Sequence, residues 1–146
     1  MAFTQVIRQH CVTRLNGLKS PSPVLTFRRY TSGISKSKTG NRVQYYTKIV
    51  FNKTITKDFF NLSATSRSAL ASIWLDMDAK KMKIQKATPQ DPPNTQFNVC
   101  VANMWKSAPN STMCISPLMK QYPALESLIN QQRVVELKDS YFELDI

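Results

Sequence analysis

Residues 64–78, ATSRSALASIWLDMD, decide between an all-β chain and one that mixes helix with sheet. Apolar side chains recur there at the i, i+3, i+4, i+7 spacing of an amphipathic helix, namely Leu70, Ile73, Trp74 and Met77. Ser63 directly precedes the segment and is a suitable N-cap. We therefore expect a helix over residues 64–78, with Trp74 in the core.

Segments typical of β-strands lie on both sides of that helix. Upstream, VQYYTKIVF (residues 43–51) alternates and is rich in β-branched and aromatic residues, so it predicts a strand. Downstream, KKMKIQK (80–86) and FNVCVANMW (97–105) predict two strands, which the proline-rich turn over 88–95 would join as a hairpin. Cys100 reads as a buried residue of the second of these strands.

Two further elements complete the expected order. Residues 112–115 form another candidate strand, and Pro123 can open a second helix with Leu125, Leu128 and Ile129 on its apolar face. Phe59 and Phe60 are expected to pack inward from the connection before the first helix. The order predicts an α/β (α+β) fold, in which helices pack on a small mixed sheet.

Three segments resemble a known family: YYTKIVF, SATSRSALASIW with Arg67, and KMKIQKATPQDPPNTQFNVCV. They are similar to the small thioredoxin-like family shared by several mitochondrial ribosomal proteins and an accessory subunit of respiratory complex I. The resemblance covers residues 43–130 and implies a βαββα thioredoxin-like fold. Ser66 stands where that family often has glycine. No C-x-x-C motif is present, so thioredoxin redox chemistry is not implied.

Charge is distributed unevenly along the 146 residues. The first acidic residue is Asp58, and eleven of the 20 lysines and arginines precede it. Residues 58–146 carry nine basic and nine acidic residues, so the net charge of +11 lies entirely in the first 57 positions. A basic segment joined to an electrically neutral remainder indicates import, nucleic-acid binding or both.

The N-terminal segment resembles a mitochondrial targeting sequence. Residues 1–30 contain four arginines, one lysine and no acid, with apolar residues at helical spacing. The sequence Arg28-Arg29-Tyr30-Thr31-Ser32 is similar to a processing site, with cleavage after Tyr30 and a mature chain of net charge +6. The alternatives are a basic arm that follows nucleic acid and a solvated N-terminus without a role. The targeting reading implies the mitochondrial matrix.

These readings divide the chain into four parts. Residues 1–30 are the targeting segment, 31–42 a basic linker or arm, 43–133 the thioredoxin-like domain, and 134–146 an acidic, apolar tail. The tail contains Tyr141, Phe142, Leu144 and Ile146, so we expect it to dock on a partner or on the chain's own core.

The residues that catalysis or metal binding would need are largely missing. His10 is the only histidine, and the three cysteines, Cys11, Cys100 and Cys114, lack metal-site spacing. A Cys100–Cys114 disulfide stays open as an alternative. Nucleotide-binding glycine motifs are absent, and no apolar run reaches the ~18 residues of a membrane helix. We expect no enzyme, metal, cofactor, small-molecule substrate or membrane insertion.

The expected function is a structural constituent of the mitochondrial ribosome that binds ribosomal RNA phosphates and neighbouring ribosomal proteins. The expected RNA-binding residues are Lys36, Lys38, Arg42, Lys48, Lys53 and Lys57, with Arg67, Lys80, Lys81, Lys83 and Lys86 secondary. Arg28 and Arg29 join them if the N-terminus is retained, and Tyr45 or Tyr46 could stack on bases. The lysines over 80–86 equally suit a protected edge strand.

Two alternatives to a ribosomal role stay open. The first is an accessory or assembly subunit of a respiratory complex, and the second is a small matrix enzyme. The sequence leaves open the ribosomal subunit, the RNA segment, the protein neighbours and whether the presequence is cleaved.

Overall fold

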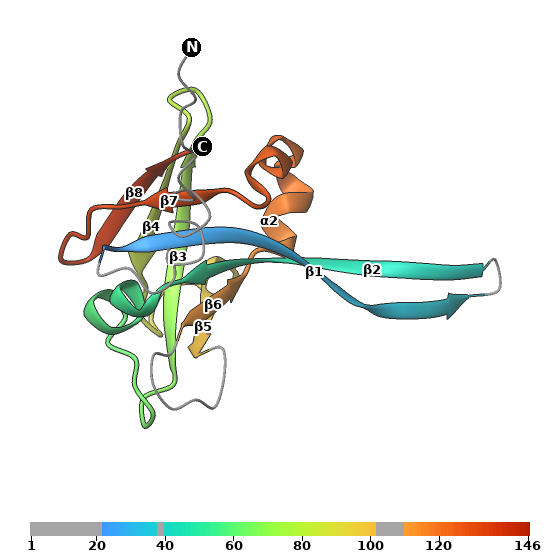
Figure 1. The fold of residues 1–146 in the computed structure, drawn as a ribbon. Helices are drawn as coiled ribbons and strands as arrows, with labels where there is room; N and C mark the ends of the chain where they lie inside the picture. Colours follow the sequence, from blue (N-terminus) through green and yellow to red (C-terminus); the bar gives the residue numbers. More distant parts are fainter. Residues whose placement is uncertain (1–21, 38–39, 102–109) are drawn as a thin grey trace, which may run out of the picture.

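A single antiparallel β-sheet organises the chain, in a computed structural model that describes residues 22–37, 40–101 and 110–146 (Figure 1). Its eight strands are β1 (Val24–Ser37), β2 (Gly40–Phe51), β3 (Ser68–Asp76), β4 (Lys81–Lys86), β5 (Phe97–Val101), β6 (Ser111–Cys114), β7 (Gln132–Val134) and β8 (Tyr141–Asp145). The helical segments are short: η2 (Ile55–Phe59), η3 (Pro93–Thr95), α2 (Ser116–Gln121) and η4 (Pro123–Leu128). The thioredoxin-like α/β prediction is therefore wrong.

The sheet curls into a nearly closed barrel. Its strand order is β7-β1-β2-β6-β5-β3-β4-β8, so β7 and β8 are the two edges. These edges meet, and the Arg133 guanidinium Nε donates a hydrogen bond of 3.0 Å to the Asp145 carbonyl oxygen. Full closure is the most complete protection of strand edges, and this side-chain contact bridges the remaining seam.

The predicted helix over residues 64–78 is replaced by β3. Alternation places Ala71 and Ile73 toward the core, and Ile73 pairs in register with Ile84 of β4. Because β3 lies between β4 and β5, both of its edges are hydrogen-bonded, and this tertiary pairing overrides the local helical spacing. Ser63 does not cap a helix; its Oγ accepts hydrogen bonds from the backbone N–H groups of Thr65 and Ser66 in a turn.

Two predicted core residues lie on the outer surface instead. Trp74 is 58% exposed, because its position in the alternation of β3 points its side chain away from the core. Cys100 is exposed on β5, where the flanking Val99 is the buried residue. Phe59 and Phe60, in contrast, pack inward as predicted.

The strand predictions are confirmed for β2, β4, β5 and β6, but the hairpin between β4 and β5 is wrong. β4 pairs with β3 and β8, and β5 pairs with β3 and β6, so β3 separates the two expected partners. The residues after Pro123 are helical, as a 3₁₀ segment with Leu125 and Leu128 buried. The expected extension of the second strand over 102–105 lies outside the described residues.

β1 and β2 form a hairpin that is much longer than the barrel wall it belongs to. In Figure 1 it projects far beyond the other strands. β1 pairs with β2 from Leu25 to Ser37, whereas β7 borders β1 only over 24–26 and β6 borders β2 only over 48–51. Residues 31–37 and 40–42, expected as a linker, therefore belong to strands β1 and β2. Gly40, the first residue of β2, adopts a φ of +128°, which glycine adopts readily.

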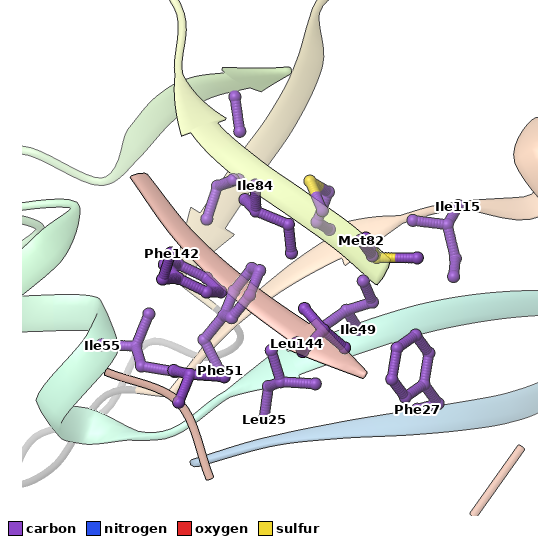
Figure 2. Close-up of a cluster of buried hydrophobic side chains, with 14 of the residues drawn as sticks. Leu25, Phe27, Ile49, Phe51, Ile55, Met82, Ile84, Ile115, Phe142 and Leu144 are labelled. Atoms are coloured by element: carbon purple, nitrogen blue, oxygen red, sulfur yellow. The ribbon is translucent and has the colours of Figure 1, made fainter. Parts of the chain in front are cut away.

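The core fills the barrel and includes an aromatic cluster (Figure 2). Phe142 of β8 makes edge-to-face contacts with Phe51 of β2 and Phe59 of η2, with ring centroids 6.2 and 4.9 Å apart. Phe142 and Leu144 are buried, so the apolar residues of the C-terminal strand pack on the chain's own core, one of the two alternatives expected for the tail. The cluster ties the last strand to the root of the hairpin.

Candidate nucleic-acid interface

The root of the β1–β2 hairpin presents two tyrosines and two cations on its outer side. Arg28 pairs in register with Lys48, and Tyr30 pairs with Tyr46. Their neighbours on the opposite parity, Phe27 and Ile49, are fully buried. Because side chains alternate along a strand, these four residues share the face that points away from the core. We call Arg28, Tyr30, Tyr46 and Lys48 the tyrosine–cation face.

Ring stacking orders this face. The rings of Tyr30 and Tyr46 are stacked, with centroids 5.3 Å apart and planes inclined by 18°. The ammonium Nζ of Lys48 lies 5.3 Å from the centroid of the Tyr46 ring. A stacked pair and a cation–π contact hold the positive charge of Lys48 close to the sheet, beside that of Arg28.

The opposite face of the hairpin rests on the helical segments. Arg29 forms an ion pair with Glu126 of η4, and the Thr47 backbone N–H donates to Ser116 Oγ at 2.9 Å. Tyr45 lies on the same face and stays 60% exposed, with the Arg29 guanidinium 6.0 Å from its ring centroid. The hairpin root is therefore anchored on one side, while Tyr45 offers an open aromatic ring.

The hairpin is uniformly basic. Residues 24–51 contain six lysines and arginines and no acid, namely Arg28, Arg29, Lys36, Lys38, Arg42 and Lys48. The following residues, 52–146, contain eleven basic and nine acidic residues, a net charge of only +2. Six of the eleven basic residues that precede Asp58 therefore lie in the β1–β2 hairpin, which we call the arm, and the chain that follows it is almost neutral.

The expected RNA-binding residues separate into groups. Lys48 joins the tyrosine–cation face, and Lys36 and Arg42 belong to the outer hairpin strands, located here by their backbone. Lys38 lies outside the described residues. So do residues 1–21 of the expected targeting segment, which include His10 and Cys11. Exposed Lys53 and Lys57 flank or lie in η2, and exposed Arg67 precedes β3.

The lysines of β4 contact side chains of neighbouring barrel elements. Lys81 forms an ion pair with Asp145, and Lys83 Nζ lies 5.3 Å from the Trp74 ring centroid and 5.8 Å from that of Tyr141. Lys86 Nζ lies 4.9 Å from the Phe59 centroid. Exposed Lys80 adopts a positive φ of 56° in the β3–β4 turn. β4 is not an edge, because it pairs on both sides, so the protected-edge reading of its lysines is wrong.

The sequence analysis does not identify Tyr30 as a candidate binding residue and includes Arg28 only if the N-terminus is retained. Both residues fall in the predicted processing site, but VLTFRRYT (24–31) also has the β-branched and aromatic content of a strand. The similar content of VLTFRRYT (24–31) and of QYYTK in β2 is the sequence signal for pairing these two strands. Tyr45 is exposed and Tyr46 is half-buried, so both lie outside the barrel core.

The described residues form no cluster of metal ligands. No group of three or more His, Cys, Asp or Glu side chains is close enough together there to hold a metal ion. Cys100 and Cys114 are both free thiols. Among the helices of the described segments, none has the length and hydrophobicity needed to span a membrane.

Comparisons with known proteins give no relatives: no family model matches the chain, and neither curated proteins nor solved structures give a significant match. A function can therefore be inferred only from the residues of the arm and of the barrel surface.

Proposed function

We propose that this protein is a non-catalytic RNA-binding subunit of a ribonucleoprotein, and that it contacts RNA phosphates with its β1–β2 arm. The observation that carries the proposal is the tyrosine–cation face on an arm with six basic residues and no acid. Phosphate contacts by lysine and arginine supply affinity that is independent of sequence.

Each face of the arm has a distinct part in this proposal. Arg28 and Lys48 neutralise phosphates on the outer face, where the stacked tyrosines hold Lys48 in place. Tyr45 lies on the other face, and its exposed ring is free to stack on an unpaired base. Arg29 is kept beside Tyr45 by Glu126 and adds charge at that position.

A binding experiment with matched variants tests the arm. RNA affinity is measured by fluorescence anisotropy between 50 and 300 mM salt, with a single-stranded dodecamer of uridine as probe. The variant R28Q/K48Q is compared with K120Q/K138Q, which removes the same charge from exposed positions on α2 and before β8. For single strands, losing two phosphate contacts lowers the slope of log affinity against log salt by roughly 1.4.

The control pair should change this slope by much less than the arm pair. Equal changes in both variants would contradict specific use of the arm. For Tyr45→Ala we expect a loss of roughly 5- to 150-fold, and for Tyr45→Phe only a small loss, because stacking on one base is worth about 1–3 kcal/mol.

The mitochondrial ribosome is the setting we propose for this binding, because the first 30 residues have targeting composition. Co-sedimentation of the protein with mitochondrial ribosomal particles, with loss of association at high salt, would support this setting. Co-migration with a membrane complex would instead favour an accessory subunit of a respiratory complex.

Cleavage after Tyr30 has a structural consequence that makes it testable. It would remove Leu25 and Phe27 from the core, together with the Tyr30–Tyr46 stack. The site stays a prediction, and the N-terminal mass of the protein isolated from mitochondria decides it. A mass that begins at Thr31 would mean that this barrel is not the mature form.

A further inference from the structure

A second aromatic surface lies on a different wall of the barrel. Trp74 of β3 is 58% exposed and pairs in register with Lys83 of β4, which in turn pairs with Glu143 of β8. Ser72, Gln85 and Tyr141 form the adjacent cross-strand row. In the sheet order, β6 and β5 lie between this wall and the arm strands.

The indole N–H of Trp74 is hydrogen-bonded to a residue of its own strand. Its N–H donates to Ser72 Oγ at 3.2 Å. The ring is therefore oriented, and what it offers to a ligand is its π-surface rather than a hydrogen-bond donor. A ligand recognised in this way has a flat, polarisable face, which is the chemistry of a nucleobase.

One cation accompanies the ring. Lys83 Nζ lies within cation–π distance of both Trp74 and Tyr141, at 5.3 and 5.8 Å from their centroids. Among the described residues Lys83 makes no salt bridge, unlike Lys81, which pairs with Asp145. A charge between two rings suits a phosphate next to a stacked base, and Glu143 beyond Lys83 favours approach from the β3 side.

The surroundings distinguish a base from a protein side chain as the ligand. The residues around Trp74 on this face are Tyr141 and four polar or charged residues: Ser72 on its own strand, Lys83 and Gln85 on β4, and Glu143 on β8. Protein-docking surfaces are marked by contiguous apolar patches, whereas here Lys83 lies between the Trp74 and Tyr141 rings in a polar frame. Stacking platforms for single-stranded nucleic acid combine an aromatic ring with a nearby cation.

We infer that Trp74, with Lys83 beside it, is a stacking site for an unpaired base of single-stranded RNA, separate from the arm. The inference rests on the proposed RNA-binding function and adds a second contact to it. Because stacking carries this contact, it depends much less on salt than the contacts of the arm.

Tryptophan fluorescence provides the test. The chain has two tryptophans, so in the W105F variant Trp74 is the only residue that emits when tryptophan is excited selectively. We expect a single-stranded uridine dodecamer to quench its emission, whereas a blunt RNA duplex of equal length should not. In anisotropy titrations, W74A should weaken dodecamer binding roughly 5- to 150-fold and W74F much less. Tyr122→Ala is the control at another exposed aromatic residue.

Two further measurements separate the possible failures. In R28Q/K48Q the quenching of Trp74 should persist at higher RNA concentration, because the arm and Trp74 lie on different walls. If the dodecamer binds tightly but leaves Trp74 emission and W74A affinity unchanged, the stacking site is overturned and the arm stands. If the protein binds no RNA, both proposals fail.

A protein ligand at this site is also covered by the experiment. Deca-aspartate matches the negative charge of a nucleic acid but has no base to stack, so it should leave Trp74 emission unchanged. Quenching by the peptide and not by RNA would overturn the inference in favour of an acidic protein partner. Circular dichroism confirms that each variant is folded before its affinity is compared.

Discussion

The rings of Tyr30 and Tyr46 stack across the β1–β2 hairpin at a centroid distance of 5.3 Å, at the point where the hairpin leaves the barrel. Only β1 and β2 pair with each other here, since β7 and β6 border them nearer the core. Two-stranded ribbons have little stability of their own. The stack therefore stabilises the base of the arm.

We predict that this stack contributes coupling energy between the two strands. Tyr30→Ala and Tyr46→Ala, alone and combined, should give a double-mutant coupling of about 0.5–1.5 kcal/mol, as measured for aromatic pairs. Urea unfolding followed by circular dichroism measures it. Arg28 and Lys48, also paired in register, provide the control cycle, for which no stabilising coupling is expected because both are cations. Additive effects of the tyrosine variants would contradict the prediction.

Cys114 gives an independent report on the binding face. It pairs in register with Lys48 on the outward side of β6, and its thiol is exposed. Cys100 is also exposed, but lies one strand further away, opposite Thr112. We predict that bound RNA slows maleimide labelling of Cys114 more than that of Cys100, measured by mass spectrometry in a C11S background. Equal protection of both thiols, or none, would place the RNA elsewhere.

The strands that bury one face could be predicted from the sequence. The alternation in residues 43–51 and the spacing of Met82 and Ile84 both reflect a side that packs in the core. The inward packing of Phe59 and Phe60 follows from the same physical cause. In these segments, burial imposes a pattern of apolar residues that a single sequence displays.

The helix over 64–78 could not be rejected from local pattern. Leu70 and Trp74 lie on the outer side of β3, so both faces of this strand carry large apolar residues and the period of two is obscured. The choice of strand depends on pairing with β4 and β5, which are distant partners. Such non-local pairing decides strand formation more than intrinsic propensity does.

The arm escaped prediction for a different reason. Beyond its root the hairpin is bordered by no other strand of the described residues, so residues 31–37 show no alternation imposed by a core. Their content of Gly, Ser and Lys therefore resembled a linker. Of the candidate site, the positive charge was predictable, whereas the pairing of Tyr30 with Tyr46 needed the register of the hairpin.

Thr26, near the start of β1, has a buried hydroxyl that allows the packing there to be tested. It is 4% exposed, and its hydroxyl Oγ1 is the one buried side-chain polar atom of the described residues without a hydrogen-bond partner. Leaving a buried hydroxyl unpaired costs about 1–3 kcal/mol. We predict that Thr26→Val, which keeps the shape and removes the hydroxyl, raises the free energy of unfolding by about 1 kcal/mol. Thr26→Ser, which keeps the hydroxyl, should give no gain; a destabilised valine variant would show that the hydroxyl is paired.

Two ion pairs lie beside the seam between β7 and β8: Lys81–Asp145 joins the paired strands β4 and β8, and Lys138–Glu136 lies in the segment between β7 and β8. The hydrogen bond and charge of Lys81 hold the pKa of the Asp145 carboxyl below its usual range, and Asp145 in turn raises the pKa of Lys81. At the neighbouring Glu136, a hydrogen bond from Lys138 likewise lowers the carboxyl pKa. The lysines of these two ion pairs can be removed one at a time.

We predict from these shifts that the Lys81–Asp145 pair stabilises the fold throughout the neutral range. A depressed carboxyl pKa gives stability that is present above the unfolded pKa and is lost as pH falls through the folded value. The raised lysine pKa gives stability that is lost only as pH rises through the folded pKa, above the usual lysine range. In a carboxyl ¹³C NMR titration, Lys81→Gln should raise the pKa of Asp145 and leave that of Glu136 unchanged, whereas Lys138→Gln should do the reverse. An Asp145 carboxyl that titrates at its ordinary pKa in the unmodified protein would show that Lys81 does not hold it.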